Sequence, residues 1–69
     1  MILDTTDVLS FQERKFLADA LLWNASDPTR FQTWWRYEKN NWKVYVYSVL
    51  KVYGAQTLHD VLERIRNKN

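Results

Sequence analysis

Few side chains of this sequence could carry acid–base or metal chemistry, and those few lie near its end. His59 is the single histidine, Asp60 and Glu63 follow it within four residues, and there is no cysteine. A nucleophilic site needs a base beside a Ser, Thr or Cys and a third group that orients the base. A zinc site needs three or four suitable ligands. His59 and its neighbours supply neither set, so we expect no catalytic residue, no metal site and no enzyme activity.

Glycine usage also argues against nucleotide chemistry. Loops that hold phosphate groups need several glycines so that backbone amides can approach the ligand, and Gly54 is the only glycine here. The acidic residues near the start, Asp4 and Asp7, lack the pattern and the glycine of a calcium-binding loop. We therefore expect no cofactor, and binding to another macromolecule is the function that is left.

Aromatic and basic residues gather in the middle of the chain. Eight of the eleven aromatic residues fall within residues 30–53, interleaved with five lysines and arginines. Tyr, Trp and Arg dominate the energetics of protein interfaces, so this stretch predicts a surface that binds another protein. The alternative is that the rings form the core of a small domain. The predicted partner-binding residues are Trp34, Trp35, Arg36, Lys39, Lys43, Tyr47 and Lys51.

A nucleic acid is the alternative partner, because Lys and Arg bind phosphates and exposed rings stack on bases. The run VLKVYGAQTLHDVLERI resembles a helix-turn-helix with Gly54 at its turn. The resemblance implies that the start of a recognition helix, near Thr57, contacts base edges. Leu50 departs from the motif, which prefers a small residue there, and Asp60 stands where the motif prefers a buried apolar one. The residues of this alternative are Lys43, Lys51, Gln56, Thr57, His59, Arg64 and Arg66.

Size and charge narrow the kind of protein. A chain of 69 residues makes one domain, near the lower size at which a core holds without cross-links. With 46% hydrophobic residues and four tryptophans, it has the composition of a folded chain. Residues 1–29 carry a net charge of −3 and residues 30–69 one of +5. This asymmetry predicts an acidic partner for the basic half, and the alternative is that the two halves attract each other.

Apolar runs are short throughout the sequence. None has the length of a membrane span or of a secretory signal, so we expect a soluble, cytoplasmic protein without a membrane partner. A compact chain without catalytic groups suits a small regulator or inhibitor that occupies the surface of another protein. The aromatic surface could also be buried in a homodimer, since twofold interfaces are the commonest assembly.

The first predicted helix begins at Ser10. Ser10 and Glu13 have the spacing of a capping box, in which each side chain accepts a hydrogen bond from the other residue's backbone amide. Asn24 is a suitable end, because Asn tolerates the left-handed conformation that often follows a helix. The apolar positions with helical spacing, which we expect to face the core, are Phe16, Leu17, Ala20 and Leu21.

A second helix is predicted from Asp27 and Pro28, because Asp is a good N-cap and proline fits the first helical position. Its period holds to Glu38, and residues 39–41 have the composition of a turn. Adjacent residues on a helix point about 100° apart. For the pair 34–35 we therefore expect one tryptophan ring to face the core and the other to lie at its margin or outside.

The last predicted helix begins at Thr57, with Asp60 completing a weaker capping pattern. Its predicted core positions are Leu58, Val61, Leu62 and Ile65. Residues 1–9 have apolar side chains available for a strap across the core, and residues 67–69 are expected to form a frayed end.

Residues 42–53 fit two periods. With a period of two, several valines share one face, and residues 40–41 become the turn of a β-hairpin. With a period of 3.6, Trp42 and Tyr45 fall on one stripe with valines, and Gly54 ends the helix. We prefer the helix. The predicted fold is an all-α single-domain bundle of three to four short helices, and the alternative is an α+β fold of helix, β-hairpin and helix.

Overall fold

The computed structural model describes residues 8–67, and every regular element within that range is helical. The elements are α2 (Phe11–Ala25), α3 (Pro28–Glu38), the 3₁₀ turn η1 (Lys39–Asn41), α4 (Trp42–Tyr53) and α5 (Ala55–Arg66). The predicted all-α bundle is confirmed. The alternative with a β-hairpin is wrong, because residues 42–53 form α4.

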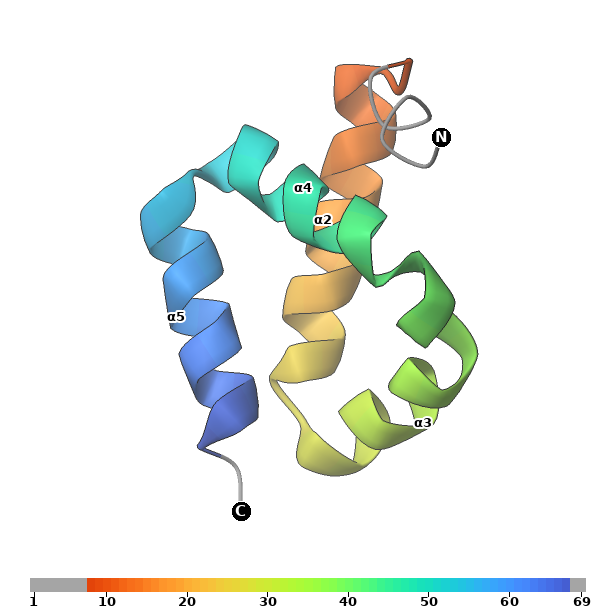
Figure 1. Ribbon diagram of the computed structural model, residues 1–69, viewed down its shortest axis with the longest axis vertical. Coiled ribbons are helices and arrows are strands. Elements are labelled where there is room, and N and C mark those ends of the chain that lie inside the picture. Colours follow the sequence, from red (N-terminus) through yellow and green to blue (C-terminus); the bar gives the residue numbers. More distant parts are fainter. Residues whose placement is uncertain (1–7, 68–69) are drawn as a thin grey trace.

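The helix α2 is central to the bundle (Figure 1). It shares its most extensive interface with α4, which crosses it, while α3 and α5 lie on opposite sides of it. Two small residues, Ala18 of α2 and Ser48 of α4, are fully buried and allow close packing. The Ser48 hydroxyl donates a hydrogen bond to the Val44 carbonyl at 2.7 Å. The buried hydrophobic residues are Ala18, Leu21, Ala25, Phe31, Tyr45, Val49 and Val61.

The start of α2 agrees with the prediction, but its buried face does not. Ser10 Oγ accepts a hydrogen bond from the Glu13 amide at 3.1 Å, and Glu13 Oε1 accepts one from the Ser10 amide at 2.8 Å. The capping box is therefore confirmed. Phe16, predicted to face the core, is 75% exposed. It is two residues from the buried Ala18, which places it about 200° around the helix from the core side.

Arg14 occupies a position on the buried side of α2. It lies at helical spacing from the other buried residues of that face, Ala18, Leu21 and Ala25. Its guanidinium nitrogen Nη1 is buried and has no hydrogen-bond partner among the described residues. An unpaired buried charge is costly, whereas the aliphatic part of an arginine packs well. Arg14 therefore contributes to the packing on the buried side of α2 through the aliphatic part of its side chain.

A polar contact joins the end of α4 to α2. Tyr53 donates a hydrogen bond from its hydroxyl to Asp19 Oδ1, and Lys15 Nζ donates one to Asp19 Oδ2 at 3.0 Å. The hydrogen bond from Tyr53, followed by that from Lys15, lowers the pKa of the Asp19 carboxyl. The Tyr53 ring itself is exposed, although the helical stripe of α4 places it beside the core positions.

The start of α3 follows from local sequence. Asp27 is the N-cap, and its Oδ1 accepts hydrogen bonds from the amides of Thr29 at 3.0 Å and Arg30 at 3.2 Å. Pro28 stands at the first helical position, where no amide hydrogen is needed. The helix ends at Glu38 and is followed by the single turn η1, so the predicted helix and turn are both confirmed.

Gly54 alone separates α4 from α5, and it has φ 100° and ψ 172°. The predicted start of the last helix at Thr57 is wrong. The Gly54 carbonyl already accepts a hydrogen bond from the Leu58 amide at 3.2 Å, so helical bonding begins directly after the glycine. No side chain caps α5, and Asp60 Oδ1 instead accepts a hydrogen bond from Gln56 Nε2 at 3.0 Å.

The predictions for the two ends are only partly within the described chain. Val8 is exposed and Leu9 is half-buried, while residues 1–7 of the predicted strap lie outside the described range. At the other end Asn67 does not fray. Its amide donates to the Glu63 carbonyl at 3.0 Å and its side chain to Glu63 Oε1 at 3.3 Å. Residues 68–69 lie outside the described range.

None of the described helices is long and apolar enough to cross a membrane.

The buried phenol of Tyr45 predicts a loss of stability in alkali. Burial, and secondarily its hydrogen bond to Glu38 Oε1 at 3.0 Å, raises the pKa of Tyr45 from 10.0 to about 12. The unfolded chain loses this proton first, so the contribution is complete below pH 10 and disappears as the pH rises to about 12. We expect the free energy of unfolding, measured with urea, to fall across that window. In Tyr45→Phe the free energy of unfolding should fall less over the same pH range. An equal fall in this variant would mean that the loss does not come from Tyr45.

Candidate functional site

A shallow depression of about 280 Å³ lies on α3 and η1, lined by Phe31, Gln32, Trp35, Arg36 and Lys39. Three of the predicted partner-binding residues, Trp35, Arg36 and Lys39, therefore meet at one place. These side chains lie close together because residues three and four apart in the sequence are neighbours on the surface of a helix. We call these five residues the α3 depression.

The aromatic part of the α3 depression is tied to the core. The rings of Phe31 and Trp35 are stacked, with centroids 5.9 Å apart and planes 24° from parallel. Trp35 also meets Trp42 of α4 edge to face at 4.8 Å. Trp34 meets Tyr45 in the same manner at 4.9 Å. The apolar side of the depression is therefore fixed in place by packing.

Both tryptophans of α3 are half-buried and pack against the core, so the predicted difference between the two rings is not found. Neither ring is fully buried and neither lies outside. One residue of helix separates the two side chains by about 100°, but the rings of α4 extend beneath both of them. Much of the aromatic density in residues 30–53 therefore stabilises the contact between α3 and α4, as the core interpretation predicts.

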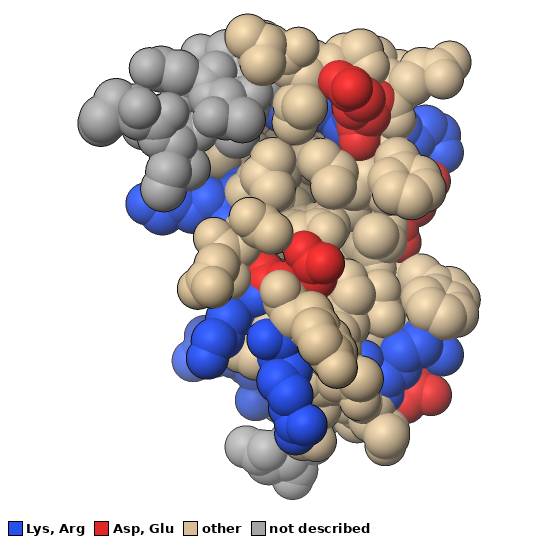
Figure 2. All heavy atoms as spheres, turned by 90° about the vertical axis from the view of Figure 1, so that its right-hand side faces the viewer, with Lys and Arg blue, Asp and Glu red and all other residues tan. Residues whose placement is uncertain are grey.

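The positive charge of the α3 depression comes from two side chains. Arg36 and Lys39 are exposed and form no ion pair with any described residue. Glu38, the single acid within residues 30–53, accepts hydrogen bonds from Tyr45 at 3.0 Å and Asn41 at 3.2 Å. Its carboxylate is thus engaged within the fold. Figure 2, which views the side where α3 lies, shows Lys and Arg gathered over the lower half of this face.

The other predicted partner-binding residues lie on α4 and do not line the α3 depression. Lys43 and Lys51 are exposed, and Tyr47 is half-buried. The helical spacing of these residues is as predicted, because α4 is a helix along its whole length. They extend the basic character of the middle of the chain without forming part of the same depression.

The residues of the nucleic-acid alternative are only partly available. The single residue between α4 and α5 makes a tighter connection than the three- to four-residue turn of a helix-turn-helix. At the start of α5, the Gln56 side chain donates a hydrogen bond to Asp60 Oδ1, and Thr57 is half-buried. His59 Nδ1 lies 3.9 Å from Asp60 Oδ1, and His59 Nε2 lies 3.8 Å from Glu63 Oε2. The remaining cations of α5, Arg64 and Arg66, are exposed.

A second exposed surface, on α2, was missed by the sequence analysis. Trp23 is 62% exposed, and the Arg30 guanidinium carbon lies 3.6 Å from its ring centroid in a cation–π contact. Arg30 Nη2 holds this position by donating to the Trp23 carbonyl at 2.6 Å and to Ser26 Oγ at 2.9 Å. Asp27 Oδ2, 3.6 Å from Arg30 Nη1, neutralises the cation.

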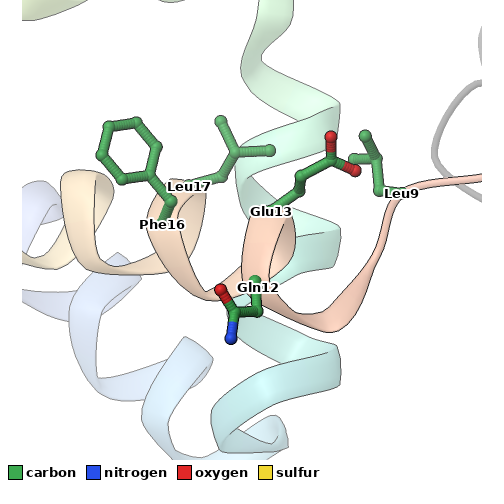
Figure 3. Close-up of a pocket in the computed structure, with 5 residues that line it drawn as sticks. All are labelled: Leu9, Gln12, Glu13, Phe16 and Leu17. Carbon is green, nitrogen blue, oxygen red and sulfur yellow. The ribbon is translucent and has the colours of Figure 1, made fainter.

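Phe16 belongs to the same outward side of α2. It lines an open depression of about 400 Å³ in which its ring and Leu17 lie on one side and Leu9 and Glu13 on the other (Figure 3). The sequence does carry a signal for this exposed surface. The apolar residues within 16–23 surround the helix instead of following one stripe. One neighbouring helix cannot cover such a pattern, so some of these rings must be exposed.

Ligand chemistry is otherwise sparse in the described chain. Within residues 8–67 no group of three or more His, Cys, Asp or Glu side chains is arranged to hold a metal ion. The depressions are open and shallow, and what they offer a ligand is an apolar surface with charged margins. No protein family matches this chain, and neither a curated protein nor a solved structure shows significant similarity to it.

Proposed function

We propose that this chain is a non-catalytic protein-interaction module, a small regulator or inhibitor that acts by occupying the surface of a partner. The observation that carries the proposal is the α3 depression, where Trp35, Arg36 and Lys39 surround one apolar hollow. Trp and Arg are enriched among the residues that contribute most to binding energy. A few such anchors in a fixed geometry bind with less loss of conformational freedom than mobile side chains do.

Internal packing supports this use of the surface. Trp35 is held by Phe31 and Trp42, so its exposed part keeps one position in the free protein. Arg36 and Lys39 add charges that no acid of the described chain neutralises. Cations near the C-terminal end of α3 also stabilise the helix dipole, but by only about 0.3–1 kcal/mol each. That effect alone does not require an aromatic hollow beside them.

Affinity capture from native lysate tests the proposal. We expect the wild-type chain to retain a protein partner after nuclease treatment. The double variant Arg36→Ala/Lys39→Ala should lose about tenfold or more in affinity for it, which is 1.4 kcal/mol or more. The matched control is Arg64→Ala/Arg66→Ala, which removes the same charge from exposed positions on α5.

The same experiment decides between the two kinds of partner. If capture disappears with nuclease, falls steeply with salt and depends on Arg64 and Arg66, the chain binds nucleic acid and the proposal is wrong. The tight α4–α5 connection and the internal bonding of Gln56 favour the protein partner. Formation of a homodimer stays a prediction, which the mass of the isolated protein in solution tests.

A further inference from the structure

We infer that the α3 depression binds an acidic peptide segment of the partner, with one large apolar side chain seated against Phe31 and Trp35 and carboxylates on Arg36 and Lys39. The inference rests on the proposed function and names the chemistry of its ligand. Three features of the described residues carry it: unpaired charge, the size of the hollow and the packing of its rings.

The charge argument concerns Arg36 and Lys39. Both cations border the same hollow, both are exposed, and neither has an ion-pair partner within residues 8–67. Exposed cations without an ion-pair partner among the described residues also occur on α4 and α5, so what distinguishes Arg36 and Lys39 is that they border one apolar hollow. A guanidinium binds a carboxylate through two parallel hydrogen bonds, and an ammonium binds it as a point charge. Complementary charge therefore means an acidic ligand.

The size of the hollow indicates one side chain. Its volume of about 280 Å³ is at the lower limit of small-molecule sites, which span about 300–1,000 Å³ and enclose most of the ligand. This depression is open and would leave a cofactor largely in water. A single aromatic or branched aliphatic side chain fits such a space. Gln32, exposed at the edge, adds an amide that can pair with the backbone of the bound segment.

The packing of the rings favours a peptide over single-stranded nucleic acid. Stacking of bases requires an aromatic face that is free. Trp35 is half-buried, with Phe31 stacked beside it and Trp42 edge to face at 4.8 Å. The exposed ring of Tyr37 does not line the hollow. What remains accessible is an apolar margin that a side chain can contact, with two cations beside it.

Titration with defined peptides tests the inference. The probe is a short synthetic peptide of glutamate and serine with one central phenylalanine, followed by NMR of the backbone amides in the intact chain. We expect shifts at Gln32, Arg36 and Lys39, and a dissociation constant that rises at least about tenfold in Arg36→Glu/Lys39→Glu. The matched variant Arg64→Glu/Arg66→Glu makes the same change of net charge on α5 and should bind within about threefold of wild type.

Two further ligands give the outcomes that would overturn the inference. The same peptide with serine in place of phenylalanine should bind at least about fivefold more weakly, because the apolar anchor is lost. Equal binding of the two peptides, equal loss in both charge-reversal variants, or tighter binding of an oligothymidylate of equal charge would each refute it. Circular dichroism of the two variants verifies that they are folded.

The failure of this inference differs from failure of the proposed function. If acidic peptides do not bind while lysate capture of a protein still depends on Arg36 and Lys39, the ligand chemistry is wrong and the interaction module stands. If capture itself is insensitive to Arg36→Ala/Lys39→Ala, the α3 depression is not the binding site and both statements fail.

Discussion

Leu21→Ala is expected to remove most of the free energy that keeps the chain folded at 25 °C. Leu21 is fully buried on the side of α2 that faces the core, together with Ala18 and Ala25. Removing a buried leucine side chain costs about 2–5 kcal/mol, from lost burial and from the cavity that remains. A core of this size rarely provides more than about 3–5 kcal/mol in total. Urea denaturation, followed by tryptophan fluorescence and circular dichroism, measures the change.

Leu50→Ala is the matched control for that experiment. Leu50 lies on α4 and is 37% exposed, so the same truncation removes less buried surface and leaves no closed cavity. We expect a loss of below about 1 kcal/mol for this variant. Similar losses in both variants would mean that the interface between α2 and α4 is not the centre of the core.

Gly54→Ala is expected to destabilise the protein by about 1–3 kcal/mol. With φ 100° and ψ 172°, Gly54 adopts a backbone conformation that is almost confined to glycine. Outside Gly54 and its two chain neighbours, a Cβ atom at this position would meet no heavy atom within 4 Å, so the loss comes from the backbone and not from a clash. Thermal or urea unfolding of the variant measures it.

Gly54→Asn distinguishes this conformation from an ordinary helix end. Asn is tolerated in the left-handed region that commonly follows a helix, but the ψ of 172° lies outside that region. We therefore expect Gly54→Asn to lose about as much stability as Gly54→Ala. Wild-type stability in the asparagine variant would show that the chain bends between α4 and α5 in a different way.

The helix boundaries that sequence reasoning predicted well depend on local chemistry. Ser10 with Glu13, and Asp27 with Pro28, each form their caps within a few residues, so no knowledge of the tertiary structure was needed. Residues 42–53 were harder, because valine and tyrosine favour strands in isolation. Their helix is supported by contacts with α2, which are distant in sequence. The start of α5 was missed because the glycine restarts the helix without any capping side chain.

The candidate site was predictable in composition but not in burial. The grouping of Trp35, Arg36 and Lys39 follows from helical spacing once α3 is recognised. The half-burial of both tryptophans depends on where α4 places Tyr45 and Trp42, which no local pattern encodes. On α2 the apolar residues surround the helix, so the choice of Ala18 over Phe16 for the core was decided by the neighbouring helices.

The central position of α2 has a consequence for biosynthesis. Its buried side faces α4, and α5 packs on it as well, yet both follow it in the chain. At about 5–20 residues per second, α2 leaves the ribosome seconds before the helices that cover it. During that interval its core residues Ala18 and Leu21 and its outward rings Phe16 and Trp23 are all uncovered. The helix that organises the folded protein therefore exposes its apolar residues to water until the later helices have been synthesised.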